Sequence, residues 1–236
     1  MQLYSKTDKT VYYSPVDSKY GDVTGDDVPD LNISRLPVQT NSELNSLLDK
    51  RAAYLARTYA GTAIFAADVY SEAEQVSFSS DIDAAINDHF SDWSVAKAYI
   101  DDMEIADARD CITDEINGGV SLFVYNGQSS NDRLSFFNLF SGDDAASISN
   151  IGQPTVVTQW GCWNTYNVEP TEISMSDLFL LEGNRGAVSV VGSSTLTDAN
   201  AERIMSDLFY AELSTGKTLE QALLDSKRKF ALDYAS

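Results

Sequence analysis

Short apolar runs alternate with amphipathic stretches along this chain, and this alternation restricts its fold more than any other feature. Continuous apolar runs, such as those at 62–69 and 119–127, are typical of strands that are buried on both faces of a sheet. Stretches with helical periodicity separate these runs, and strands that alternate with helices form a mainly parallel sheet. The sequence therefore predicts an α/β fold, with a mainly parallel sheet flanked by helices on both faces.

The expected elements follow one another in a regular order. We expect strands at 62–69, 93–100, 119–127, 154–161 and 186–194, and helices at 81–90, 104–116, 175–183, 198–214 and 218–234. Another helix opens with Asn41 as its capping residue and presents Leu44, Leu47, Leu48, Ala52 and Leu55 on one face. Because no Pro-rich or Gly/Ser-rich linker divides the chain, we expect a single domain over residues 1–236.

The net charge of the chain limits the kinds of partner that it can bind. The chain carries 36 acidic and 16 basic side chains, a formal net charge of −20. A surface of this charge repels a phosphate backbone, so we expect no binding to nucleic acid. No apolar stretch approaches the roughly 18 residues of a membrane span, so we expect no insertion into a membrane. Cys111 and Cys162 are the only cysteines, and two thiols are too few for a disulfide framework or a cysteine-rich zinc site.

Polar side chains follow three of the expected strands at the point where each strand ends. Asp68 ends the first, Gln128 lies in the turn 126–129, and Cys162 directly follows the run 154–161. The carboxyl ends of parallel strands meet at one edge of a sheet, where functional groups gather. A thiol at such a position can act as a nucleophile. The alternative is that Cys162 is a buried core cysteine.

The segments around these positions resemble a known family. VSLFVYNGQSS resembles the strand that ends in the catalytic histidine of the gingipain family (peptidase family C25), and VVTQWGC resembles the strand that ends in its cysteine. The segments DVPDLNISRLPVQTNSELNSLLDKRAAYL, RGAVSVVGSSTLTD and TLEQALLDSKRKF resemble further blocks of the family in consistent order, over about residues 10 to 232. The resemblance implies a caspase-like fold and a cysteine endopeptidase that acts on proteins or peptides through an acyl-thioester on Cys162.

The resemblance also assigns roles to individual residues. Asp68 resembles the acid that orients the family's histidine, and the N–H groups of Ser129 and Cys162 would form the oxyanion hole. The segment Val191–Thr195, with Gly192, Ser193 and Ser194, would pair with an extended substrate by β-augmentation. Asp81 and Asp198 lie near the positions at which gingipain-type enzymes carry the acid that selects substrates cut after Arg or Lys. Each of the two is open to another interpretation, as the N-cap of the helix that it precedes.

Gln128 stands where the family has its general-base histidine, and Leu134 stands where an aromatic residue is common. A glutamine has no titratable proton near neutral pH, so it cannot replace the imidazole as a base. An inactive form, a divergent peptidase with another base, and a non-catalytic peptide- or protein-binding module all remain open. His89, the single histidine, ends a helix rather than a strand, which favours a capping or surface role. A flavodoxin-like response module would also have the predicted sheet, but this sequence lacks a phosphate-binding glycine-rich turn.

The remaining expectations concern metal ions and location. Asp22, Asp26 and Asp30 lie in an acidic loop in which the resemblance implies a structural Ca²⁺, and a solvated acidic turn is the alternative. No cofactor is required for the expected chemistry. Family members are secreted or displayed on the cell envelope, although the first residues of this segment show no signal-peptide pattern. The family's first strand–helix unit and its Gly-Asp-Pro segment have no counterpart here, which is consistent with a fragment.

Overall fold

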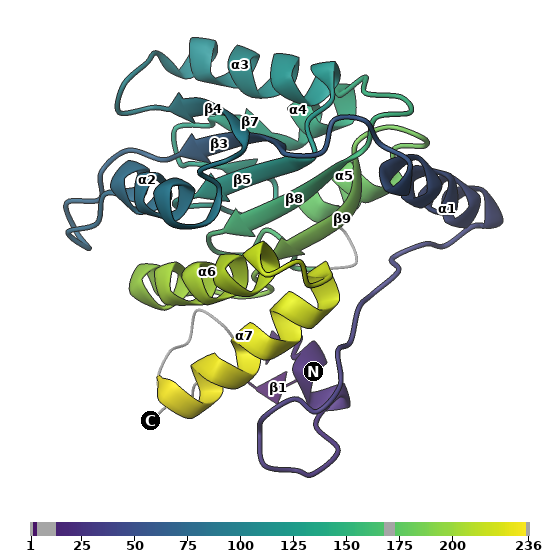
Figure 1. The fold of residues 1–236 in the computed structure, drawn as a ribbon, viewed down its shortest axis with the longest axis vertical. Coiled ribbons are helices and arrows are strands. Elements are labelled where there is room, and N and C mark those ends of the chain that lie inside the picture. The colour runs from purple at the N-terminus through teal and green to yellow at the C-terminus, as the bar shows by residue number, and fades with distance from the viewer. Residues whose placement is uncertain (1, 4–12, 168–172, 235–236) are drawn as a thin grey trace.

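The chain folds around one five-stranded parallel sheet (Figure 1). The computed structural model describes residues 2–3, 13–167 and 173–234. The sheet contains β3 (Thr62–Ala67), β4 (Ser94–Tyr99), β5 (Leu122–Asn126), β8 (Thr155–Trp160) and β9 (Ala187–Gly192), in the order β4-β3-β5-β8-β9. All neighbouring strands in this order are parallel. The predicted parallel sheet is confirmed, although each strand is shorter than the apolar run that predicted it.

Helices cover both faces of this sheet, as the sequence predicts. On one face lie α2 (Phe78–His89) and α6 (Ala199–Ser214), with α7 (Leu219–Asp233) packed against α6. On the other lie α3 (Ile105–Gly118), α4 (Gly142–Ser147) and α5 (Met175–Leu181). Figure 1 shows α3 above the sheet and α6 and α7 below it. The remaining helix, α1 (Asn41–Leu55), lies beside β9 and α5.

Alternate residues of each strand enter two separate apolar cores. Ile64 and Ala66 of β3 pack into the core beneath α3, α4 and α5, which we call the α3 layer. Ala63 and Phe65 of the same strand pack toward α2 and α6, in what we call the α6 layer. This separation follows from the period of two in a strand, which turns successive side chains to opposite faces. The continuous apolar runs are therefore explained by burial on both faces.

Several short elements were not predicted. These are β1 (Gln2–Leu3), β2 (Tyr13–Ser14), the 3₁₀ helix η1 (Asp17–Tyr20), β6 (Arg133–Leu134), β7 (Phe140–Ser141) and α4. Elements of two to six residues carry too few side chains to show a periodicity. The pair β6–β7 matters for the site because it shapes the long loop that follows β5.

The first helix differs from its prediction in two respects. Its N-cap is Thr40 rather than Asn41, because Thr40 and Glu43 form a reciprocal capping box. Of the five residues expected on its buried face, only Leu47 is buried, whereas Leu48, Ala52 and Leu55 are exposed. The helix packs along one edge of the sheet and not across a face, so a narrower stripe is covered.

Strand register fixes the place of the two loops that carry Gln128 and Cys162. Asn126, the last residue of β5, pairs with Trp160, the last residue of β8. Gln128 and Cys162 each lie two residues beyond this pair. Parallel neighbours that end at the same level deliver both residues to the same rim of the sheet.

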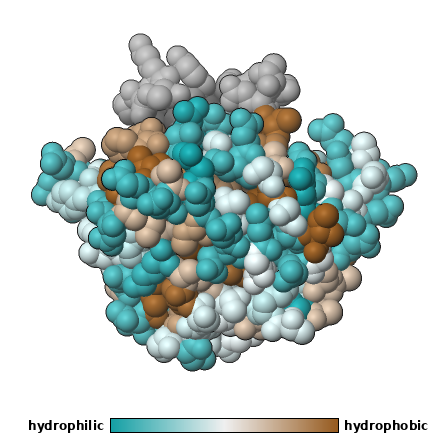
Figure 2. Space-filling model, turned by 90° about the horizontal axis from the view of Figure 1, so that it is seen from above, coloured by the Kyte–Doolittle hydropathy of each residue, from teal (hydrophilic) through white to brown (hydrophobic). Residues whose placement is uncertain are grey.

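The surface on the α3 side is mainly hydrophilic, with scattered hydrophobic patches (Figure 2). This agrees with the large excess of acidic side chains in the sequence. Among the described residues, no helix is both long enough and apolar enough to cross a membrane.

A buried lysine fastens α1 to the rest of the fold. Lys50 is 1% exposed, and its ammonium donates hydrogen bonds to the carbonyls of Leu180 (2.6 Å) and Arg185 (3.1 Å). Burial lowers the pKa of this ammonium to about 8, against the attraction of Glu182. Leu180 lies in the last turn of α5, where carbonyls have no partner within the helix. The lysine therefore satisfies acceptors that would otherwise be buried and unpaired.

We expect Lys50→Ala to lower the free energy of unfolding by about 2–4 kcal/mol, because it removes charge-assisted hydrogen bonds and leaves two buried carbonyls without a hydrogen-bond donor. Urea denaturation measures this change. Leu48→Ala on the same helix is the control: this side chain is 54% exposed, so its loss should cost less than about 0.5 kcal/mol. Equal losses in the two variants would contradict the role given to Lys50.

Candidate active site

The loops after β5 and β8 are in direct contact. Gly127 N–H donates to the carbonyl of Trp160 (3.0 Å), and the Ser129 hydroxyl donates to the carbonyl of Cys162 (2.7 Å). Gly161 makes this approach possible, since a Cβ there would stand 2.3 Å from both Gly127 O and Ser129 Oγ. The predicted rim of the sheet therefore brings the loops of residues 128 and 162 together.

Asp68 supports the loop after β5 from below. Its carboxylate accepts hydrogen bonds from the backbone N–H of Gln128 (3.0 Å) and from the buried hydroxyl of Ser135 (2.7 Å). Tyr125, from β5, also approaches Asp68 (3.4 Å) while donating to the carbonyl of Gln128 (2.6 Å). Burial raises the pKa of the Asp68 carboxyl, although these hydrogen bonds oppose the shift. Asp68 thus holds the backbone of residue 128, which differs from the predicted role of orienting the side chain there.

The carboxylate that meets the side chain of Gln128 belongs to Glu74. Gln128 Nε2 donates to Glu74 Oε2 (2.7 Å). Glu74 lies in the turn between β3 and α2, where an isolated bridge pairs Ser71 with Val76. A side chain at position 128 therefore has a carboxylate partner, as an imidazole that acts as a base requires. In this chain Glu74, and not Asp68, contacts the side chain at position 128, and the role of Asp68 in orienting a histidine stays a prediction.

The thiol of Cys162 faces a different residue, Thr197. Sγ lies 3.4 Å from Thr197 Oγ1, 3.4 Å from its N, which donates to the sulfur, and 3.8 Å from its carbonyl O. The Thr197 hydroxyl in turn donates to Glu202 Oε1 (2.6 Å). Cys162 is 9% exposed as a residue. The sulfur is thus partly sheltered at the rim and contacts a hydroxyl, a backbone N–H and a carbonyl.

Glu202 is a partly buried acid in α6 whose pKa is strongly shifted. Burial, together with the smaller effect of the nearby carboxylates of Glu74 and Asp198, raises the pKa of its carboxyl to about 8, although the hydrogen bond from Thr197 opposes this shift. A carboxyl with this pKa is mostly protonated at neutral pH, yet a minor fraction is ionised. Such a group can both accept and donate a proton near pH 7.

Asn164 connects the loops around the cysteine. This buried side chain donates to Ser129 Oγ (3.3 Å) and accepts from Ser193 N–H (3.1 Å). Between it and the cysteine, Trp163 has a φ of 66°, in the left-handed region that is unfavourable for a bulky residue. The chain therefore turns sharply directly after Cys162, and Asn164 fixes the turn against both neighbouring loops.

The predicted substrate-pairing segment is partly occupied by the protein itself. The carbonyls of Ser193 and Thr195 accept hydrogen bonds from Thr165 N (2.9 Å) and Trp163 N (3.0 Å). Thr165 Oγ1 donates to the carbonyl of Gly192 (3.1 Å). On another side of this segment the Ser194 hydroxyl donates to the carbonyl of Pro15 (2.9 Å). Substrate pairing along Val191–Thr195 stays a prediction, and one edge of the segment is already paired with the loop after Cys162.

Of the two predicted specificity acids, only Asp198 caps a helix, and a role of either acid in substrate selection stays a prediction. Asp198 is the N-cap of α6 and accepts from Ala201 N–H (3.0 Å). Asp81 is not an N-cap, because α2 begins at Phe78 and its cap is Ser77. Burial raises the pKa of the Asp81 carboxyl, and the charge of Arg203 on α6 opposes this shift. The alternative that the sequence left open is therefore right for Asp198 and wrong for Asp81.

The acidic loop near the N-terminus is held together by its own carboxylates. Asp22 accepts from the N–H groups of Gly25 (2.6 Å) and Asp27 (3.0 Å), and Asp30 accepts from Val23 N–H (2.8 Å). Backbone hydrogen bonds from Thr24 and Val23 lower the pKa of Asp30. In the described part of the chain, no group of three or more His, Cys, Asp or Glu side chains is placed to hold a metal ion. Calcium at Asp22, Asp26 and Asp30 stays a prediction.

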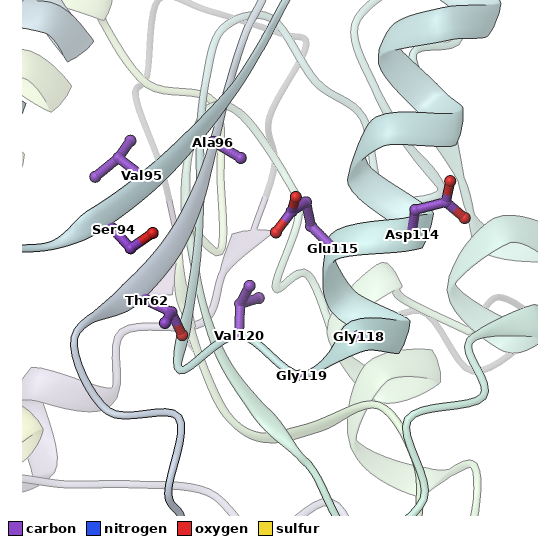
Figure 3. Close-up of a pocket in the computed structure, with 9 residues that line it drawn as sticks. All are labelled: Thr62, Ser94, Val95, Ala96, Asp114, Glu115, Gly118, Gly119 and Val120. Atoms are coloured by element: carbon purple, nitrogen blue, oxygen red, sulfur yellow. The ribbon is translucent and has the colours of Figure 1, made fainter.

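Other candidate positions lie away from the rim. His89, at the end of α2, pairs with Asp207 of α6 (2.8 Å), and Cys111 lies half-buried in α3. A cavity of about 380 Å³ opens at the amino ends of β3 and β4 (Figure 3). Glu115 points toward its interior and Asp114 points away. This cavity lies at the opposite end of the sheet from Cys162, so it does not belong to the same site.

Sequence reasoning placed Cys162, Gln128 and Asp68 at one rim but missed three residues that contact them or their loops, and a fourth, Glu202, that contacts one of these three. These are Glu74, Asn164, Thr197 and Glu202. Their polar side chains resemble many others in an acidic chain, and their partners are distant in sequence. Only for Glu202 did a signal exist, since an acid in the first turn of a helix can reach back to a preceding hydroxyl.

The chain is similar to known proteins over nearly its whole length. The sequence model of peptidase family C25 matches residues 3–235. No curated protein matches the chain. Among solved structures, the Arg-specific cysteine proteinase gingipain R superposes with a TM-score of 0.79 at 16% identity, covering 94% of this chain and 56% of that chain. The complex of Porphyromonas gingivalis RgpB pro- and mature domains gives 0.80 at 17% identity, covering 92% and 55%.

These likenesses confirm the predicted caspase-like fold. A third structure, described only as a protease, gives a TM-score of 0.71 at 16% identity, covering 82% of this chain and 43% of that chain. The chain thus spans about half of the length of the structures that it matches. At this level of identity the structural likeness concerns the fold.

We expect Gly161→Ala to lower the free energy of unfolding by about 1–3 kcal/mol, because the added methyl group overlaps two atoms of the neighbouring loop. Chemical denaturation measures the loss. Gly118→Ala is the matched control, since a Cβ at this position in α3 meets nothing within 4 Å. The control should keep or slightly raise stability, and a loss as large as that of Gly161→Ala would contradict the close contact of the two loops.

Glu202 should make stability depend on pH. Because its pKa is about 8 in the folded chain against 4.5 for an unperturbed glutamate, the folded state binds more protons between these values. Its contribution to stability is therefore fully present below about pH 4.5 and is lost as the pH rises toward 8. We expect Glu202→Gln to flatten the dependence of the free energy of unfolding on pH between 5 and 8, measured by urea denaturation. An unchanged slope would be inconsistent with the raised pKa.

Proposed function

Because the chain belongs to peptidase family C25, we propose that it is the catalytic region of a cysteine endopeptidase, with Cys162 as the nucleophile. One observation carries the proposal: Cys162 directly follows the carboxyl end of β8, and its carbonyl accepts a hydrogen bond from Ser129, in the loop whose residue 128 is backed by the carboxylate of Glu74. A nucleophile on one strand end and a base position on the next is the arrangement that acyl transfer requires.

In the proposed reaction the Cys162 thiolate attacks the carbonyl carbon of the scissile peptide bond. The negative charge that develops on the carbonyl oxygen is stabilised by the N–H groups of Ser129 and Cys162. Ser129 supports this role, because it forms a non-hydrogen-bonded pair with Leu134, flanked by the bonds from Ser130 N to Arg133 O and from Ser135 N to Gln128 O. Its own N–H therefore points away from β6. The amine then leaves, and water hydrolyses the acyl-thioester.

Gln128 limits this chemistry. Its amide can hold a hydrogen bond to a substrate or to Glu74, but it cannot take the proton of the thiol or give one to the leaving amine. We therefore propose that the chain, as written, hydrolyses peptides far more slowly than a form with histidine at 128. General acid–base catalysis by such a side chain is worth about 10²–10⁴ in rate.

The substrate is proposed to be a protein or peptide, with a basic residue before the scissile bond. Glu74 and Asp198 are both exposed and both lie close enough to Glu202 to raise its pKa, so their carboxylates would attract a cationic side chain to this part of the rim. Asp81 is a weaker candidate, because Arg203 is its neighbour. Secretion or display on the cell envelope, and a structural Ca²⁺ in the loop 22–30, are further proposals that rest on the resemblance to the gingipain family.

A non-catalytic binding module is the second candidate. The hydrogen bond between Gln128 and Glu74 favours it, because the amide is held in this place by a contact that involves no proton transfer. Such a module would keep the peptide-binding rim and use it for recognition alone.

We expect Gln128→His to raise the rate of hydrolysis of Arg- and Lys-containing fluorogenic peptides by at least about tenfold, because an imidazole at 128 can move protons near neutral pH. Adding Cys162→Ala to this variant should abolish the gain. Adding Glu74→Gln should reduce it, since the imidazole then loses the carboxylate that sets its tautomer.

The control for Glu74→Gln is Asp101→Asn. Asp101 is another acid at this end of the sheet, and its carboxylate accepts a hydrogen bond from the backbone N–H of Tyr70 (3.0 Å). This change should leave the gain in place. If Gln128→His and the original chain both fail to cleave any member of a broad peptide library, the peptidase proposal is rejected in favour of the binding module.

A further inference from the structure

The sulfur of Cys162 is connected to a carboxyl group through one hydroxyl. Sγ lies 3.4 Å from Thr197 Oγ1, and Thr197 Oγ1 donates to Glu202 Oε1 at 2.6 Å. Because the hydroxyl gives its proton to the carboxyl, its lone pairs are free to accept the proton of the thiol. The three groups therefore form a continuous path for a proton.

The surroundings of Glu202 suit a proton carrier. Glu74, from the turn before α2, and Asp198, the N-cap of α6, are the charged groups that raise its pKa. Tyr125 of β5 is also close enough for the charge of Glu202 to raise the pKa of its phenol. These neighbours and burial disfavour the ionised carboxyl, so it accepts a proton readily.

We propose that Cys162 exchanges its proton with the carboxyl of Glu202 through the hydroxyl of Thr197, so that this path replaces the missing base at position 128. The proposal deepens the proposed function and rests on it as far as peptide hydrolysis is concerned. Thr197, which contacts the reacting sulfur, is a catalytic residue. Glu202, which acts through Thr197, is a positioning residue that holds the proton.

The protons balance over one cycle. The ionised form of Glu202 takes the hydroxyl proton of Thr197 as Thr197 takes the thiol proton, which leaves a thiolate and a neutral carboxyl. The thiolate forms its bond to the substrate carbonyl carbon, and the leaving amine receives the stored proton when the C–N bond breaks. Water then attacks the thioester and returns a proton to Glu202, and the acid product leaves as the sulfur is reprotonated. The N–H of Thr197, 3.4 Å from Sγ, stabilises the thiolate in between.

A structural interpretation competes with this proposal. Thr197 directly precedes the N-cap Asp198, and a carboxyl that reaches back to a hydroxyl at this point also stabilises the start of a helix. The two interpretations differ in what happens to the thiol. If Glu202 only stabilises the start of the helix, the reactivity of Cys162 does not depend on it. If Glu202 acts only through the negative charge of its ionised carboxyl, without taking a proton, that charge opposes formation of the Cys162 thiolate.

Alkylation of Cys162 tests the proposal without requiring peptide hydrolysis. Iodoacetamide is attacked by the thiolate, which forms an S–C bond and expels iodide, while the thiol proton remains on the protein or enters water. We would measure the second-order rate between pH 5 and 10 in a Cys111→Ser background, so that only Cys162 reacts. The variants are Glu202→Gln, Thr197→Val and Thr197→Ser, with circular dichroism as the check on folding.

At pH 7 we expect Glu202→Gln and Thr197→Val each to slow alkylation by roughly tenfold, because each interrupts transfer of the thiol proton. Thr197→Ser keeps the hydroxyl and should react at nearly the original rate. The double variant Glu202→Gln/Thr197→Val should be no slower than either single variant, since both act on one path. The variants should converge at pH 10, where hydroxide removes the proton.

The opposite results would overturn the proposal. If Glu202→Gln reacts as fast as the original chain or faster, Glu202 acts only by its charge or as a helix cap. If Thr197→Val and Thr197→Ser react alike, the hydroxyl carries no proton. Failure of every peptide assay, combined with the expected alkylation pattern, would reject the peptidase function while leaving the proton path intact.

Discussion

The parallel register of β5 and β8 determines what this molecule can do. Because Asn126 and Trp160 are paired at the ends of their strands, Gln128 and Cys162 leave the sheet side by side. Backbone and side-chain hydrogen bonds then join the two loops, and Asp68 fixes one of them from below. A slip of one residue between these strands would turn every core side chain to the wrong face. Burial on both faces of the sheet therefore holds the chemistry of the rim in place.

The architecture was predictable because its signal is repeated. Five apolar runs each report a strand that is covered on both faces, and their alternation with helices leaves few topologies. The exposed side of α1 was not predictable in the same way. Leu48 and Leu55 have the spacing of a buried face, but the helix lies along an edge of the sheet, where periodicity alone does not tell how wide a stripe is covered.

The site was predictable only where strands end. Cys162, Gln128 and Asp68 each follow an apolar run, so their common location could be derived from the sequence. Glu74 lies on an irregular turn, and nothing in a chain with 36 acidic residues distinguishes it from the others. The role first given to Asp68 is divided in the structure: Asp68 holds the backbone of residue 128 and Glu74 holds its side chain. Sequence position could identify the strand end, but which carboxylate reaches the amide depends on the path of a loop.

The two apolar cores separate the neighbours of the thiol. The loop of Gln128 continues into Leu134, Leu139 and Phe140, which pack in the α3 layer, whereas Thr197 and Glu202 belong to the start of α6, whose later residues pack in the α6 layer. Cys162 lies between the loop of Gln128 and the segment that leads into α6. The α3 layer and the α6 layer are built from different side chains, so a substitution in one layer need not disturb the packing of the other. Around the proposed nucleophile Cys162, a substitution in the loop of residue 128 therefore need not disturb the packing that positions Thr197 and Glu202.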